Sequence, residues 1–68
     1  MQALDAKLIL TKNVNEFKNT FDKESADGGL HLYLGKVMLS VELGLITLKE
    51  MDEYIDRLFN EHFHVKNG

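Results

Sequence analysis

The side chains with the most chemical potential lie toward the C-terminal end of the sequence. His62 and His64 are possible metal ligands, and Asp52 and Asp56 have the one-turn spacing of a pair that could hold a hard cation or act as general acid and base. On a helix His62 falls among apolar residues while His64 points the other way, so the two histidines cannot chelate one ion. A solvated acidic face is the simpler explanation of the two aspartates. The sequence therefore predicts no metal and no cofactor.

Nucleophilic and phosphate-binding chemistry also lack their motifs. The chain has no cysteine, and neither Ser25 nor Ser40 lies in a Gly-x-Ser-x-Gly context. Residues 29–36 resemble a phosphate loop, but five residues separate the glycines where the motif needs four, and Val37 replaces the required Ser or Thr. We therefore expect that the protein is not an enzyme.

The length of the chain limits how it can be stabilised. Its 68 residues predict a single domain over residues 1–68, and so small a fold usually needs disulfides, a metal or oligomerisation. Without cysteine the first support is excluded, so an efficient helical core or a partner chain must supply stability. Because the longest apolar region is interrupted by polar residues and glycine, no membrane span is expected. Together with the missing cysteines this favours a cytoplasmic location, and the small size suggests a bacterial or phage origin.

The best-defined local pattern is a short connection between two helices. Gly44 suits the left-handed residue that closes a helix, and Thr47 with Glu50 has the spacing of a capping box. Ile46 and Met51 would form the accompanying hydrophobic staple. Along the last helix the apolar residues share one broad side, which we expect to be core: Leu48, Met51, Tyr54, Ile55, Leu58, Phe59 and Phe63.

The middle helix, about Leu30 to Leu43, has apolar residues on two sides. One stripe is made by Leu30, Leu34, Val37, Met38 and Val41, and the other by Leu32, Leu39 and Leu43. A helix that is apolar on most sides is normally buried, so both stripes need a covering. We expect the core and dimer contacts of the chain to be made by Leu32, Leu39, Leu43, Leu34, Val37 and Val41.

The N-terminal half is less clearly patterned. The segment SADGG, residues 25–29, reads as a loop, and a helix is expected over residues 13–25 with Asn13 as its N-cap. Residues 3–11 fit either a helix or a strand. The predicted fold is all-α, a small bundle of three to four helices with a C-terminal antiparallel helical hairpin. The alternative is an α+β fold with a two-stranded ribbon from residues 4–10 and 30–34, although such a ribbon is marginal on its own.

These patterns favour a regulatory or adaptor protein that acts by protein–protein contact as a homodimer. Its partners would be a second copy of itself and an unidentified protein, which the charged side of the last helix would bind through Asp52, Glu53, Asp56 and Arg57. One alternative is an acidic inhibitor of a nucleic-acid-binding enzyme, although the net charge of −3 is small for that role. Another is a helix-turn-helix DNA-binding regulator, whose reading helix would begin with mostly acidic residues. Nucleic acid is therefore not the expected partner.

Overall fold

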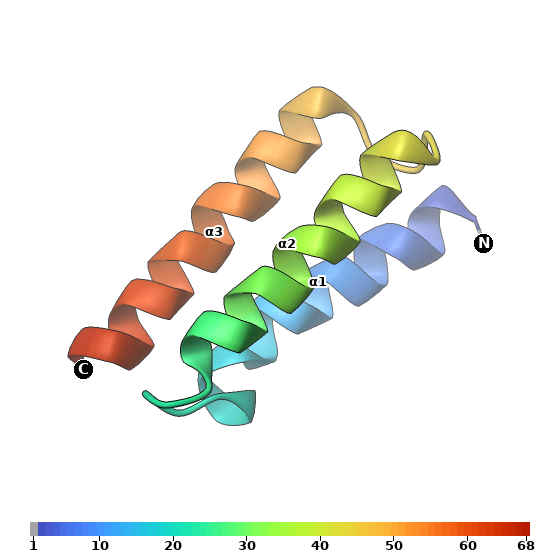
Figure 1. Cartoon of the computed structure of the whole chain (residues 1–68). Coiled ribbons are helices and arrows are strands. Elements are labelled where there is room, and N and C mark those ends of the chain that lie inside the picture. The colour runs from blue at the N-terminus through green and yellow to red at the C-terminus, as the bar shows by residue number, and fades with distance from the viewer. Residues whose placement is uncertain (1) are drawn as a thin grey trace.

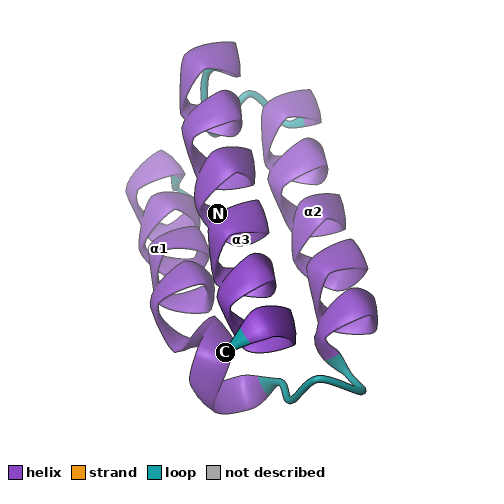
Figure 2. Cartoon of the chain, turned by 90° about the vertical axis from the view of Figure 1, so that its left-hand side faces the viewer, coloured by secondary structure: helices purple, strands orange, loops and turns teal. Residues whose placement is uncertain are grey.

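Three helices account for most of the described chain. The computed structural model describes residues 2–68, which form α1 (Ala3–Thr20), α2 (Ala26–Glu42) and α3 (Leu48–Asn67). The helices lie alongside one another, with α1 and α3 running in the same direction and α2 in the opposite one (Figures 1 and 2). The all-α class is confirmed. The ribbon alternative is wrong, because residues 4–10 lie within α1 and residues 30–34 within α2.

Helix α1 is longer than its sequence pattern indicates. The ambiguous residues 3–11 and the first part of the expected helix 13–25 form one continuous helix, which ends at Thr20. Asn13 lies inside this helix rather than at its N-cap, and its buried amide oxygen accepts no hydrogen bond from the described residues. The helix continues through Asn13 because one face packs on the core along its whole length, through Ala6, Leu10, Val14 and Phe17.

Helix α2 begins earlier than expected, inside the segment that was interpreted as a loop. The turn before it is held by Asp22, whose Oδ1 accepts hydrogen bonds from the backbone N–H groups of Glu24 (3.0 Å) and Ser25 (2.9 Å). Gly29 is buried, and a Cβ placed there would lie 2.5 Å from the ring of Phe21. The loop interpretation of residues 25–29 was wrong because this glycine serves close packing rather than a turn.

The connection between α2 and α3 has the local chemistry that its sequence predicts. Gly44 has a φ of 71°, the left-handed conformation that favours glycine. The Glu50 N–H donates to Thr47 Oγ1 (3.1 Å), and the Thr47 N–H donates to Glu50 Oε1 (2.9 Å), which completes the capping box. Ile46 is buried, and Met51 packs against the same apolar cluster. The left-handed Gly44 after α2 and the capping box at the start of α3 together fix the direction of α3 relative to α2.

One apolar cluster joins all three helices. Phe17, Val37 and Leu58 are its largest fully buried side chains, one from each helix. Beside them Tyr54 reaches from α3 to α1, where its hydroxyl lies 3.2 Å from the Lys7 carbonyl oxygen and 3.0 Å from Thr11 Oγ1. The core therefore fixes which face of each helix points inward.

The outer surface departs from expectation on α3. Leu48, Phe59 and Phe63, which were expected in the core, are 67%, 50% and 60% exposed. They lie on a second line of the helix beside the one that carries Tyr54 and Leu58, and neither α1 nor α2 covers it. Among the described residues, no helix combines the length and apolar character that crossing a bilayer requires.

Candidate functional site

The six residues expected at the core and dimer contacts separate into two groups. Val37 is buried, and Leu34 and Val41 are half-buried against the apolar cluster. Leu32, Leu39 and Leu43 are 56%, 53% and 63% exposed. The two stripes predicted for the middle helix are therefore real, although Met38 of the first stripe is also exposed. The second stripe faces away from the core.

This exposed stripe borders a groove between α1 and α2, which we call the α1–α2 groove. The groove has a volume of about 320 Å³ and is lined by Ala6, Ile9, Leu10, Lys36, Leu39, Ser40 and Leu43. Its single charged side chain is Lys36, whose ammonium group lies 5.0 Å from the centre of the Tyr33 ring. Ser40 donates its hydroxyl hydrogen to the Lys36 carbonyl oxygen within the helix (2.8 Å). The remaining surface is apolar, and that composition suits a hydrophobic side chain from another protein.

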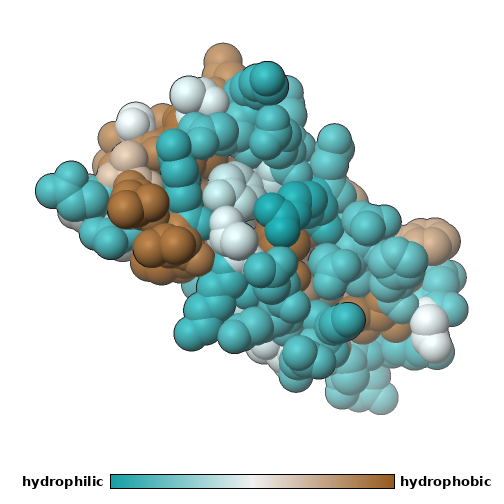
Figure 3. Space-filling view, turned by 180° about the vertical axis from the view of Figure 1, so that it is seen from behind, coloured by the Kyte–Doolittle hydropathy of each residue, from teal (hydrophilic) through white to brown (hydrophobic). Residues whose placement is uncertain are grey.

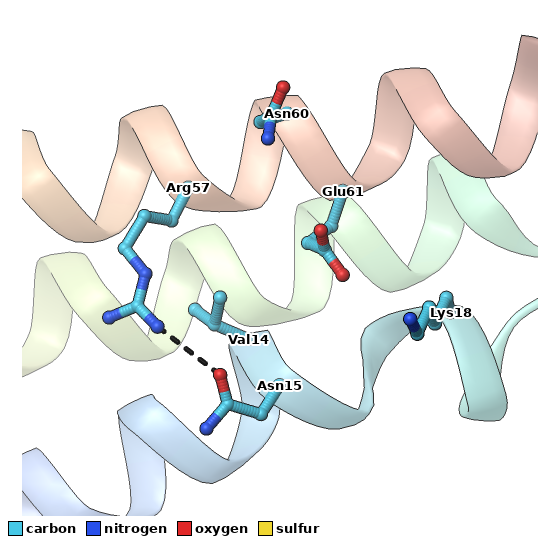
Figure 4. Close-up of a pocket in the computed structure, with 6 residues that line it drawn as sticks. All are labelled: Val14, Asn15, Lys18, Arg57, Asn60 and Glu61. Carbon is cyan, nitrogen blue, oxygen red and sulfur yellow. Dashed lines mark hydrogen bonds between the residues drawn. The ribbon is translucent and has the colours of Figure 1, made fainter.

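A second recess, of about 260 Å³, lies between α1 and α3 (Figure 4). Its lining is polar except for one valine: Val14, Asn15, Lys18, Arg57, Asn60 and Glu61. Arg57 and Asn15 point toward one another, and the guanidinium Nη2 donates to the amide oxygen of Asn15 at 3.2 Å. The recess offers amide and cationic hydrogen-bond donors.

The predicted partner-binding residues are only partly brought together. Asp52, Glu53 and Asp56 are exposed on the outer side of α3, whereas Arg57 turns toward α1 and binds Asn15. The aspartates keep the one-turn spacing expected of them, but within residues 2–68 no group of three potential ligand side chains could hold a metal ion. Asp52, Glu53 and Asp56 therefore remain as an acidic face without the arginine.

A contact that the sequence interpretation missed joins the far ends of α2 and α3. His62 Nε2 lies 2.6 Å from Asp27 Oδ1, and Lys66 Nζ lies 3.5 Å from Asp27 Oδ2. These interactions with His62 and then Lys66 lower the pKa of Asp27 below 3.8. The signal was available in the chain direction: residues equally distant from the Gly44 turn become neighbours when two connected helices run in opposite directions. Asp27 lies 17 residues before Gly44 and His62 lies 18 residues after it, so the two come close to that pairing.

Acid should weaken the fold through carboxylates that are hydrogen-bonded in the folded chain. Backbone N–H donation from Thr47, followed by the Lys7 side chain, lowers the pKa of Glu50 below 4.5, and Lys7 Nζ lies 2.9 Å from Glu50 Oε2. A lowered folded pKa means that the unfolded chain binds protons first, so the stabilisation is complete above the ordinary pKa and is lost as the pH falls through the folded value. We expect the urea midpoint to fall from about pH 4.5 downward.

Glu50→Gln isolates the contribution of Glu50 to this effect. The variant should have a lower urea midpoint at pH 7, because it loses the ion pair with Lys7. Its acid dependence should be flatter, because its amide cannot gain a proton. Glu53→Gln is the matched control, since Glu53 lies exposed on the same helix and accepts no hydrogen bond from the described residues. Equal acid profiles for Glu50→Gln and the unaltered chain would contradict the assignment.

The back of the molecule has a different character from the α1–α2 groove. Figure 3 shows this side mostly hydrophilic, with hydrophobic atoms gathered at the end where the chain begins. Leu4 and Leu8, which are 67% and 60% exposed, belong to the first turns of α1. Leu4 shares a line of α1 with Thr11, which contacts Tyr54 of α3, so Leu4 lies on the α3 side and away from the groove.

Comparison with known proteins finds no family model, no curated protein and no solved structure that matches the chain. Function must then be inferred from the surfaces of the chain itself.

Proposed function

We propose that the protein is a non-enzymatic regulatory or adaptor protein that works as a homodimer through protein–protein contact. The observation that supports this proposal is the exposed leucine stripe of Leu32, Leu39 and Leu43 beside the α1–α2 groove. Contiguous exposed apolar surface on a small fold typically marks an interaction site. A second copy that covers the stripe would also supply burial that a chain of this length lacks.

The proposal includes a particular architecture. We take the chain to be a three-helix bundle whose α2 and α3 form the antiparallel hairpin expected from the short connection at residues 43–47. In this arrangement α2 presents its second apolar side outward, and α3 presents the acidic face of Asp52, Glu53 and Asp56 elsewhere on the surface. The dimer contact and the partner contact are then separate, as an adaptor requires. Opposite charge on the partner would raise its association rate, so the acidic face favours a basic protein surface.

Sedimentation equilibrium of the unaltered chain and of Leu39→Asp tests the dimer. We expect the unaltered chain to be dimeric at tens to hundreds of micromolar and Leu39→Asp to be monomeric and still helical. A carboxylate at position 39 would be buried without a partner in the dimer, whereas in the single chain that position is about half exposed and the charge stays hydrated.

Leu4→Asp is the matched control for this experiment. It introduces the same charge at an exposed leucine of α1 on the α3 side, so its dimer should survive. An unaltered chain that stays monomeric across the whole concentration range would overturn the homodimer. Dissociation by both variants alike would show that charge, rather than the leucine stripe, controls assembly.

A further inference from the structure

We infer that the second copy docks α2 against α2 in antiparallel orientation, with the leucines of each helix packed over the glycines of the other. This inference rests on the proposed homodimer and names its geometry. The contact line, which we call the seam, consists of Gly28, Leu32, Gly35 and Leu39. Their spacing of four, three and four residues is the heptad spacing that keeps one line of a helix facing a partner helix. All four residues are exposed on the side of α2 that faces away from the core.

Nothing within a single chain uses the absence of side chains at the two seam glycines. A Cβ at Gly28 or Gly35 would meet no atom within 4 Å, and within residues 2–68 only Gly44 has a positive φ. Glycine is a poor helix former, so each position weakens α2 without any gain inside the chain. What a glycine does permit is the close approach of a second backbone. The seam therefore has two recesses at the glycines and two projections at the leucines.

One antiparallel register fills both recesses at once. The step from Gly28 to Leu32 equals the step from Gly35 to Leu39, so a two-fold axis that places Leu32 over Gly35 of the second copy also places Leu39 over its Gly28. A parallel pair in register would instead set leucine against leucine and glycine against glycine, which leaves voids that weaken packing. The self-complementary shape identifies another copy of this chain as the occupant, since an isologous contact requires a surface that matches itself.

Charges beside the seam agree with this register. In this register the two-fold axis crosses α2 between residues 33 and 34. The ring centroids of Phe17 and Tyr33 are 6.0 Å apart, so this level of α2 lies beside Phe17 of α1. Glu16 lies two turns after Ile9, on the α1 line that borders the groove. Lys36 and Glu16 of the second copy then lie within about 5.4 Å along the helix axis, one helical turn. Neither charge belongs to an ion pair within the described chain, so both are available to fix the orientation.

The size of the contact sets the concentration range for the test. A standard interface buries about 800 Å² from each partner, roughly a sixth of the 4577 Å² that this chain exposes. One pair of short helices with the flanking groove residues covers less than that. The dimer should therefore be reversible, and its dissociation constant should lie in the micromolar range.

Gly35→Ala distinguishes the dimer contact from changes in monomer stability. It should stabilise the monomer and weaken the dimer. At concentrations where the chain is monomeric the melting temperature should rise by roughly 4–8 °C, since alanine is the better helix former and meets no neighbour. The dimer dissociation constant should rise by about tenfold or more, because the added methyl group stands where a leucine packs, and symmetry repeats the clash. His64→Ala, an exposed change on α3, is the control and should leave the dissociation constant unchanged.

Spin labelling at Glu42→Cys measures the register directly, and the absence of native cysteine makes the labelling specific. The antiparallel register separates the two positions by roughly 25 Å along the helix axis, whereas a parallel pair would hold them at about the 8–10 Å interaxial distance. A long separation together with a weakened Gly35→Ala dimer supports the seam. A dimer with a short separation, or one indifferent to Gly35→Ala, overturns the seam and leaves the homodimer standing. A chain that never dimerises overturns both.

Discussion

Phe17→Ala should lower the free energy of unfolding by about 3–5 kcal/mol, the usual result of deleting a buried aromatic ring. Phe17 has no exposed surface, and its ring packs against Phe21 at 5.0 Å and Tyr33 at 6.0 Å between centroids. A domain of this length is expected to have only roughly 3–10 kcal/mol of total stability. The variant should therefore be largely unfolded near physiological temperature, and urea titration followed by far-UV circular dichroism would measure the loss.

Phe63→Ala is the matched control because it deletes the same ring from an exposed position. Phe63 is 60% exposed on α3, so its removal should change the free energy of unfolding by no more than about 0.5 kcal/mol. Similar losses in the two variants would contradict the division between the buried core line and the outer line of α3. The comparison also measures how much of the chain's apolar content serves stability and how much remains for contact.

The features that were predicted correctly depend on interactions between residues close in sequence. The capping box of Thr47 and Glu50 and the left-handed Gly44 follow from short-range geometry, which any helix end of that sequence would adopt. Helix was also correct for the last segment, because its apolar spacing continues over several turns.

Errors arose where two apolar lines share a helix or where packing overrides a local preference. Periodicity shows that Leu58 and Phe59 are apolar, but it does not tell which of them meets a neighbouring helix, and the structure buries Leu58 and exposes Phe59. Asn13 by itself favours the start of a helix, but α1 continues past it because buried residues on both sides of Asn13, such as Leu10 and Val14, pack in the core. Such outcomes depend on the relative placement of helices, which local spacing does not specify.

The candidate surfaces show the same limit. The exposed stripe of Leu32, Leu39 and Leu43 was recognisable as a separate line, because its members are about half a turn away from the first stripe. The hydrogen bond from Arg57 to Asn15 was not recognisable from the sequence, since it joins residues on α3 and α1 that no local pattern relates. The contact between Asp27 and His62 could have been predicted once α3 was known to run opposite to α2.

Gly44 and Gly29 are glycine for different reasons, and only the reason for Gly44 could be identified from local sequence. Gly44 adopts a backbone conformation that side chains resist. Gly29 makes room for the Phe21 ring, and Gly35 has open space around it. The pair Asp27-Gly28 and the following Gly29 look like turn punctuation, but the neighbouring aromatic ring decides why Gly29 is glycine.

Gly29→Ala should therefore destabilise the chain by about 1–3 kcal/mol, as overpacking of a core usually does. Its Cβ would stand 2.5–2.6 Å from three atoms of the Phe21 ring. That ring has little freedom to move, because it packs against Phe17 at 5.0 Å and Tyr33 at 5.4 Å between centroids. Urea denaturation at concentrations where the chain is monomeric would measure the effect, with Gly28→Ala as the control, since a Cβ at that position meets nothing within 4 Å.

A double-mutant cycle with Phe21→Ala would assign the cost of Gly29→Ala to this single contact. With the ring removed, the methyl group at position 29 has space, and its effect should fall to zero or become stabilising by up to about 1 kcal/mol, the ordinary preference of a helix for alanine. A cost that persists in the Phe21→Ala background would mean that the backbone, rather than the ring, requires glycine. A cost that disappears would show that the start of α2 is set by how closely this helix must approach the aromatic side chain at the end of α1.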